Sequence, residues 1–299
     1  MTETAIASPM CSKNSEVDLT NEISELVNAA TRAENSGDLA AAFETWERLS
    51  SQIRRADFRC QLGRIATKLK KWADAERAFT EALSINSGFS VAMLLMGSLF
   101  LERTDGDQTS NAESAKVWLS RSLDLDPTAM GWSLLGAALY RLDEKQAAKR
   151  AYRTALGLDE SYAEAYFNLG ILVAEEENDI EAEDLLRRAI QLDPRFLVAH
   201  GRLGLLLQKQ GRYAEAESEF NRCLEINPDN YFSHLYLANT LEIEGRGLEA
   251  EQEYRKALKA RSGDEHALKL LARYLESISR EEEAAELRSQ LNCSGHKRK

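Results

Sequence analysis

Proline is scarce in this sequence. The chain has 4 prolines among 299 residues, whereas average usage of about 5% would give roughly 15. Helix interiors reject proline, because its ring clashes with the preceding turn and it has no backbone N–H to donate. The scarcity excludes proline-rich linkers and collagen-like segments, and it favours an all-α protein.

Paired cysteines are also lacking. The four cysteines are Cys11, Cys60, Cys223 and Cys293, and none forms the C-x-x-C pair of zinc ribbons or redox motifs. Cys60 and Cys223 fall within helical patterns, where a cysteine most often serves as a small core residue. The sequence therefore predicts buried, free thiols and a reducing compartment, most simply the cytoplasm.

An excess of positive charge and long apolar runs are missing as well. The formal net charge is −11, which disfavours binding to nucleic acid and to anionic membranes. No stretch approaches the roughly 18 consecutive apolar residues of a spanning helix, and the first residues lack the basic and apolar regions of a secretory signal. We therefore expect no nucleic-acid partner, no membrane association and a cytoplasmic location.

What the sequence does contain is a 34-residue repeat. Pro194 and Pro228 stand one such period apart, and each follows an Asp or Asn. Self-similarity at a period of this size is typical of stacked repeat architectures. The clearest mark is an alanine that returns at one place in every repeat, with strict 34-residue spacing over its last five members: Ala42, Ala75, Ala115, Ala148, Ala182, Ala216, Ala250 and Ala284.

Each repeat reads as two helices joined by a short turn. Apolar residues at i, i+3 and i+7, as in Trp132, Leu135 and Leu139, mark one face of a first helix. Turn residues such as those around Gly211 follow, and then comes the helix that carries the repeating alanine. Outside the longer third repeat, a glycine or alanine stands twelve positions before that alanine, and in all repeats but the last a large apolar or aromatic residue stands four after it, which predicts a close approach of the two helices.

These residues resemble the tetratricopeptide repeat family. The stretches that carry the resemblance are YAEAYFNLGILVAEEENDIEAEDLLRRAIQLDPRF, from Tyr162, and AHGRLGLLLQKQGRYAEAESEFNRCLEINPDN, from Ala199. The resemblance implies an all-α fold, a right-handed superhelical α-solenoid of stacked helix-turn-helix repeats. We expect a disordered segment over 1–18, a solenoid over 19–291, a basic disordered tail over 292–299, and eight repeats: 23–55, 56–89, 90–128, 129–162, 163–196, 197–230, 231–264 and 265–291.

The third repeat is longer than the others. The extra residues lie around Arg103–Glu113 and are polar, which predicts a loop inserted at the turn between the two helices. A tolerated insertion is the favoured interpretation, because surface loops accept added residues. A loop that contributes to the choice of partner is the alternative.

The resemblance also implies a concave surface lined by the first helix of every repeat, the usual site for peptides or partner helices in this family. The sequence places mostly apolar residues there, which is typical of a protein-binding surface. Some of them could instead be buried between helices or covered by the N-terminal segment of the chain. The predicted partner-binding groove comprises Val91, Leu94, Leu95, Met130, Leu134, Tyr140, Phe167, Asn168, Ile171, Arg202, Leu205, Phe232, Tyr236 and Asn239, with Leu101, Val198, Leu235, Asp57, Gln61, Arg64 and Lys68 also on this surface.

Two uses known in the family are not matched by this groove. Chaperone-binding members hold a C-terminal carboxylate with a clamp of Lys, Asn and Arg side chains. Here the equivalent positions are mostly apolar, as at Leu95 and Leu134, and Arg64 stands where the clamp needs Asn. Glycosyltransferase-type members carry a ladder of asparagines, of which only Asn168 is present.

Residues suited to catalysis or metal binding are few. No Gly-rich phosphate loop, G-x-S-x-G or H-E-x-x-H motif occurs. His200 and His234 occupy the same position of neighbouring repeats and should lie close together, so a metal site is one interpretation. Packing is the favoured one, because the same repeat position holds Trp132 and Tyr166 and no carboxylate or thiolate shares it. We expect no catalytic, cofactor-binding or metal-binding residues and no cofactor.

The function predicted from these features is that of a non-catalytic scaffold or adaptor. A peptide or helix of a partner protein would bind in the apolar concave groove. Two alternatives stay open. The chain could be a structural module that assembles with copies of itself, giving a homo-oligomer, or an accessory subunit that presents a substrate to an enzyme.

Overall fold

The structure, a computed structural model, describes residues 12–295, with side chains over 21–290. Within this range all regular structure is helical and no strand occurs. None of these helices is both long and apolar enough to cross a membrane. The sixteen helices are α1 Ser12–Ser36, α2 Leu39–Gln52, α3 Ala56–Lys68, α4 Trp72–Ile85, α5 Ser90–Glu102, α6 Gln108–Leu125, α7 Ala129–Arg141, α8 Lys145–Leu158, α9 Ala163–Glu175, α10 Asp179–Leu192, α11 Leu197–Lys209, α12 Tyr213–Ile226, α13 Tyr231–Ile243, α14 Gly247–Ala260, α15 Glu265–Ser277 and α16 Glu281–Gly295.

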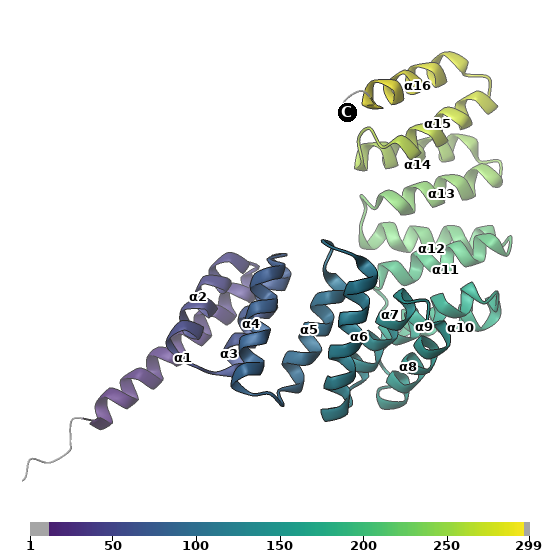
Figure 1. Cartoon of the computed structure of the whole chain (residues 1–299). Coiled ribbons are helices and arrows are strands. Elements are labelled where there is room, and N and C mark those ends of the chain that lie inside the picture. The colour runs from purple at the N-terminus through teal and green to yellow at the C-terminus, as the bar shows by residue number, and fades with distance from the viewer. Residues whose placement is uncertain (1–11, 296–299) are drawn as a thin grey trace, which may run out of the picture. The chain divides into compact units, whose positions relative to one another are not determined.

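These helices form eight pairs, one for each predicted repeat (Figure 1). The chain divides into two compact halves, an N-terminal half that ends at Leu158 and a C-terminal half that begins at Asp159. Within each half, the odd-numbered first helix of a repeat packs on its own second helix, and that second helix packs on the first helix of the following repeat. The expectation of an all-α repeat solenoid is confirmed.

The close approach of paired helices depends on the glycines of the first helices. A Cβ atom at Gly136 would lie 2.6 Å from the Tyr152 ring, and one at Gly204 would lie 2.6 Å from the Phe220 ring. Both rings are almost fully buried, so each fills the space that the missing side chain leaves. The repeating alanines are 0–1% exposed from Ala42 to Ala284, as their spacing predicted.

The turn between the two helices of a repeat contains one residue in the left-handed region. Gly211 and Gly245 occupy this position with φ of 77°, which glycine adopts at no steric cost. Asp143, Glu177 and Ser279 occupy the same position, with φ of 58–62°. The 34-residue period is therefore a period of backbone conformation as well as of side chains.

The ends of the chain differ from the sequence-based expectation. Helix α1 begins at Ser12, so the predicted disordered segment over 1–18 must be corrected at residues 12–18. Helix α16 reaches Gly295, which likewise corrects the start of the predicted tail. Neither α1 nor α16 holds a proline, or a glycine before its last residue, so nothing in the sequence interrupts them. Residues 1–11 and 296–299 lie outside the described part of the chain.

The insertion of the third repeat is only partly a loop. Residues 103–107 connect α5 to α6, and the residues from Gln108 onward add a turn to the start of α6, which has 18 residues where α8 has 14. Asp107 caps this turn by accepting a hydrogen bond from the Ser110 N–H at 2.7 Å. Arg103 ties the loop to the previous repeat through Glu76 at 2.9 Å. The predicted loop is therefore helical from Gln108 onward, with Asp107 as the N-cap.

Candidate functional site

The predicted groove residues remain accessible. None of the fourteen is buried, and three large apolar side chains among them are about half exposed: Val91 (44%), Met130 (49%) and Phe232 (51%). In the N-terminal half the set comes from α5 and α7, and in the C-terminal half from α9, α11 and α13. Two residues of the wider surface are not accessible: Leu101 and Leu235 are 7% and 4% exposed, because they face the second helices.

A mostly apolar hollow lies in the C-terminal half, between α11 and α13. We call it the aromatic hollow; its volume is about 430 Å³. The Phe232 ring stacks on Tyr236 with ring centroids 6.4 Å apart and meets Tyr231 edge-on at 5.1 Å. The lining combines four predicted groove residues with neighbours from the same helices: Leu197, Val198, Gly201, Arg202, Leu205, Asn230, Phe232, Ser233 and Tyr236.

A second hollow adjoins the first on the other side of α11. This charged hollow, of about 250 Å³, shares Arg202 and Leu205 with the aromatic hollow. Lys209 and Asp179 pair across it at 2.9 Å. Its lining residues are Ile171, Ala174, Glu175, Asp179, Leu186, Arg202, Leu205, Leu206 and Lys209.

Asn239 is engaged within the protein. Its side-chain oxygen accepts a hydrogen bond from Gln208 Nε2 at 2.8 Å, and the same Nε2 also donates to the Thr240 hydroxyl at 3.2 Å. These contacts join α11 to α13. Asn239 therefore holds the wall of the predicted groove in place, and a ligand would have to displace Gln208 to use its amide oxygen.

The N-terminal half has its own hollow, of about 520 Å³, between α1, α2 and α3. Asp57, Gln61 and Arg64 line it, as the wider prediction placed them on this surface. Arg64 is held by Glu34 of α1 through an ion pair of 2.5 Å. The apolar walls contributed by α1 were missed, because the first repeat departs most from the repeating pattern.

The histidines His200 and His234 have polar partners on both ring nitrogens. Nδ1 of His200 lies 2.6 Å from Glu219 and Nε2 lies 3.2 Å from the Pro194 carbonyl. His234 repeats the arrangement with Glu253 at 2.6 Å and the Pro228 carbonyl at 2.9 Å. No carboxylate shares the repeat position of the histidines, but each ring is met by a glutamate from a different position of the repeat, which the sequence analysis did not foresee.

The sequence missed this pairing because each glutamate lies on the other helix of the repeat from its histidine, at a different position of the repeating pattern. Hydrogen bonding to Glu219 outweighs burial and raises the pKa of His200 above its usual value. Burial favours the neutral form of Glu253, but hydrogen bonds from His234 and Lys256 outweigh it, so the pKa of this carboxyl is lowered. No group of three His, Cys, Asp or Glu side chains suited to a metal occurs within the described residues.

The two cysteines of the helical repeats are buried and free, as predicted. Burial raises the pKa of the Cys60 thiol to about 12 and also raises that of Cys223. A thiol with a raised pKa is mostly protonated at neutral pH, and the protonated form is a poor nucleophile. These residues therefore fit a packing role.

A ladder of arginines crosses from repeat to repeat in the C-terminal half. Each arginine precedes the second helix of its repeat and recurs with the period of the repeat. It pairs with the glutamate three positions later and with a glutamate of the preceding repeat, as in Arg212, Glu215 and Glu183; Arg246, Glu249 and Glu217; Arg280, Glu283 and Glu251. The sequence analysis did not find this ladder, although the Arg-x-x-Glu spacing at each turn was a visible signal.

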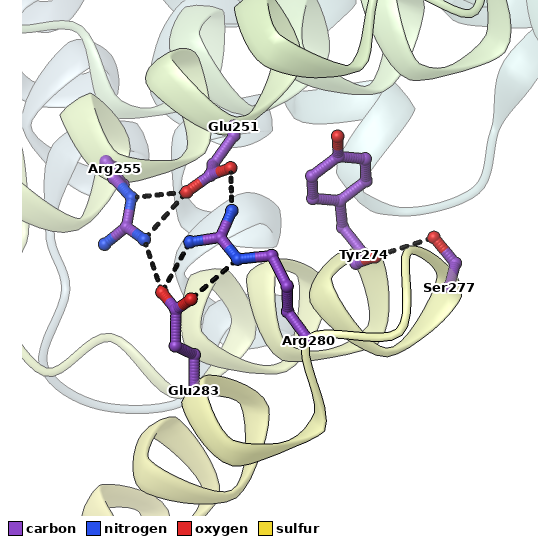
Figure 2. Close-up of polar contacts among 6 residues, drawn as sticks. All are labelled: Glu251, Arg255, Tyr274, Ser277, Arg280 and Glu283. Carbon is purple, nitrogen blue, oxygen red and sulfur yellow. Dashed lines mark hydrogen bonds and ion pairs between the residues drawn. The ribbon is translucent and has the colours of Figure 1, made fainter.

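Figure 2 shows the last rung of the ladder, where Arg280 lies between Glu251 and Glu283 at 2.5 and 2.6 Å. Arg255 joins the same two glutamates at 2.7 and 3.3 Å. Burial favours the neutral form of Glu251, but its hydrogen bonds from Arg255 and Arg280 outweigh it, so its pKa is lowered. The two arginines and the two glutamates form ion pairs with one another and join neighbouring repeats, so this cluster has a structural role.

Comparisons with known proteins agree with this architecture. Tetratricopeptide repeat models match residues 133–195 and 198–230. The fold is similar to that of a chain in the APC/C hetero-tetramer Cut9–Hcn1, with a TM-score of 0.66 and 16% identity over 79% of this chain and 48% of that chain. No match was found among curated protein sequences.

Two further solved structures are covered almost completely by the chain. One is PilF of Pseudomonas aeruginosa, with a TM-score of 0.59 and 27% identity over 68% of this chain and 90% of that chain. The other is a tetratricopeptide repeat protein from Parabacteroides merdae, with a TM-score of 0.62 and 18% identity over 85% and 99% of the two chains. Residues 133–195 and 198–230 are therefore tetratricopeptide repeats, and the 34-residue period of the helix pairs, with its glycines that admit buried rings, continues the same architecture in their neighbours.

Proposed function

We propose that the protein is a non-catalytic scaffold that holds a peptide or helix of a partner protein against the first helices of its repeats. Protein–protein interaction is the general role of tetratricopeptide repeats. The observation that carries the finer proposal is the aromatic hollow, which is lined by the half-exposed side chains Val198 of α11 and Phe232 of α13. Concave, mostly apolar surfaces with a few polar groups are the usual form of binding sites.

Several features of the hollow suit a partner segment. Its walls come from helices, so the side chains are held on a rigid frame. Phe232 and Tyr236 present ring surface, and aromatic residues contribute strongly to protein interfaces. Burial of the exposed apolar surface on binding would supply the main driving force. Self-association, presentation of a substrate and a cytoplasmic location stay predictions.

The test compares matched charge insertions in the C-terminal half. The variant Phe232→Glu places a carboxylate in the aromatic hollow, at a side chain that is 51% exposed. The control Leu248→Glu changes an apolar side chain on α14 that is 80% exposed and lines neither hollow. Affinity capture from native lysate, read by mass spectrometry, should lose its partners with Phe232→Glu and retain them with Leu248→Glu.

The same design applies to the N-terminal half. Met130→Glu alters the predicted groove, and Val117→Glu, at a side chain that is 57% exposed on α6, is its control. Helical circular dichroism of all four variants must match that of the wild type before the captures are compared. Recovery of the same partners by wild type, Phe232→Glu and Met130→Glu would show that the groove is not the binding site.

A further inference from the structure

We propose that the groove of the C-terminal half selects a partner segment in which an acidic side chain stands next to a large apolar one. The apolar side chain would enter the aromatic hollow, and the carboxylate would pair with Arg202. This inference deepens the proposed function and rests on it. It comes from the placement of one arginine rather than from the groove as a whole.

Arg202 occupies the boundary between the two hollows. It lines both the aromatic hollow and the charged hollow, together with Leu205 one turn further along α11. It is the one charged side chain among the described residues that line the aromatic hollow. The lining of the aromatic hollow therefore offers a ligand one charge, which is positive.

The guanidinium of Arg202 is available. It is exposed, and no hydrogen bond, ion pair or ring contact engages it within the described residues. Its neighbours differ: Lys209 pairs with Asp179 at 2.9 Å, and Arg212 with Glu183 at 2.8 Å. A guanidinium offers five donors in a planar fork that matches a carboxylate. In a chain with a net charge of −11, such an unpaired fork distinguishes this part of the groove by its sign.

The aromatic side of the site is held rigid by a second arginine. The Arg261 guanidinium lies 4.3 Å from the centroid of the Tyr231 ring and 5.3 Å from that of Phe232. The Tyr231 hydroxyl in turn donates a hydrogen bond to Asp264. Because these contacts come from within the protein, Phe232 is positioned before a ligand arrives, which lowers the entropy cost of binding.

The charged hollow does not oppose the acid of the ligand. Its lining holds two acidic and two basic side chains: Glu175, Asp179, Arg202 and Lys209. Asp179 is paired with Lys209 at 2.9 Å. The preference for an acid therefore depends on Arg202, at the boundary of the two hollows.

The other polar groups of the aromatic hollow are uncharged. The Asn230 side chain accepts hydrogen bonds from the Ser233 N–H at 2.9 Å and from the Ser233 hydroxyl at 2.8 Å, which caps α13. Both residues are therefore engaged in ending the loop before that helix. Arg202 is therefore the lining residue that distinguishes an acidic ligand from a basic one.

The test uses an array of synthetic peptides with a Gly/Ser background and the full-length protein. One series carries Glu beside Leu, Phe or Trp, and matched series replace the Glu by Gln or Lys, or the apolar residue by Ala. The best Glu-containing peptides should bind about tenfold more tightly than their Lys counterparts, measured by fluorescence anisotropy. Replacement of the apolar residue by Ala should remove binding.

Three variants assign the effect to named residues. Arg202→Gln should abolish the preference for Glu, and Arg202→Glu should reverse it toward Lys. The control Arg150→Glu makes the same charge change at an exposed helical arginine of the N-terminal half and should leave the preference intact. Thermal unfolding of each variant checks that the fold is retained.

The outcomes separate this inference from the proposed function. Equal binding of Glu and Lys peptides, lost in Phe232→Ala, would overturn the role of Arg202 and leave an apolar groove that binds proteins. The inference would also be overturned if the wild type bound every peptide as weakly as the Phe232→Glu variant does. The proposed function would then be decided only by whether native partners are captured by the wild type and lost in Phe232→Glu.

Discussion

Gly204 and Gly201 lie on the same helix, α11, and alanine substitutions at the two positions should have opposite effects. A Cβ at Gly204 would be 2.6, 2.9 and 3.0 Å from three carbons of the Phe220 ring, which is fully buried. Overpacking of a core costs about 1–3 kcal/mol, partly offset by the gain of about 1 kcal/mol that alanine brings to a helix. Gly204→Ala should therefore lower the free energy of unfolding by up to about 2 kcal/mol.

At Gly201 the nearest atom to the added Cβ would be the Cys223 sulfur, 3.9 Å away, an ordinary contact. Gly201→Ala should therefore raise the free energy of unfolding by up to about 1 kcal/mol. Gly170 lies between these cases, because its Cβ would be 3.2 Å from Leu186. Urea unfolding followed by circular dichroism should order the variants, from least to most stable, as Gly204→Ala, Gly170→Ala and Gly201→Ala.

The double variant Gly204→Ala/Phe220→Leu separates the clash from other effects. Each change alone destabilises, but the smaller leucine makes room for the added methyl, so the two losses should not add. Equal stability of Gly204→Ala and Gly201→Ala would refute the reasoning, because it would mean that the buried ring does not determine which residue fits on α11.

Three further predictions concern the turns, the ladder and the histidines. Glu177 has a φ of 60° at the turn position where Gly211 has a φ of 77°. Glu177→Gly should therefore raise the free energy of unfolding in urea, and Gly211→Ala should lower it, each by about 1 kcal/mol. A change of the same sign in both variants would contradict this prediction. Arg280→Ala should speed amide exchange in α15 and α16, and the difference from wild type should shrink in molar salt. The hydrogen bond to Glu219 raises the pKa of His200, so the pair of protonated His200 and Glu219 stabilises the fold fully below the ordinary histidine pKa of about 6.5, and this stabilisation is lost as pH rises through the raised pKa. The difference in free energy of unfolding between wild type and His200→Gln should therefore be largest at acid pH and smaller at neutral and alkaline pH. A difference that does not change with pH would contradict this prediction.

The repeat made most of the fold predictable. A 34-residue period identifies equivalent positions, so Ala216 and Gly204 could be assigned to contacts between helices from the sequence alone. It does not identify which residue of the second helix faces a given residue of the first. The pairing of His200 with Glu219 was missed for this reason, since it links two different positions of the repeat.

The sequence predicted which helices form the groove, but not how exposed each of their side chains is. The first helices of this chain are apolar around much of their circumference, and eight residues of α13 are buried. Periodicity then places Leu235 and Tyr236 on the same surface, whereas packing buries the first and leaves the second partly open. Exposure depends on how far each helix rotates against its neighbours, which single-sequence patterns do not contain.

The arginine ladder determines where the chain can be shortened. Each rung takes its arginine from one repeat and a carboxylate from the repeat before it, so a cut between repeats removes the cation and keeps the anion. A fragment that ends after α14 would keep Glu251, whose side chain is 12% exposed, and would lose Arg280. Glu251 would then keep its ion pair with Arg255 at 2.7 Å, so a fragment with this end would have one arginine where the full-length protein has two.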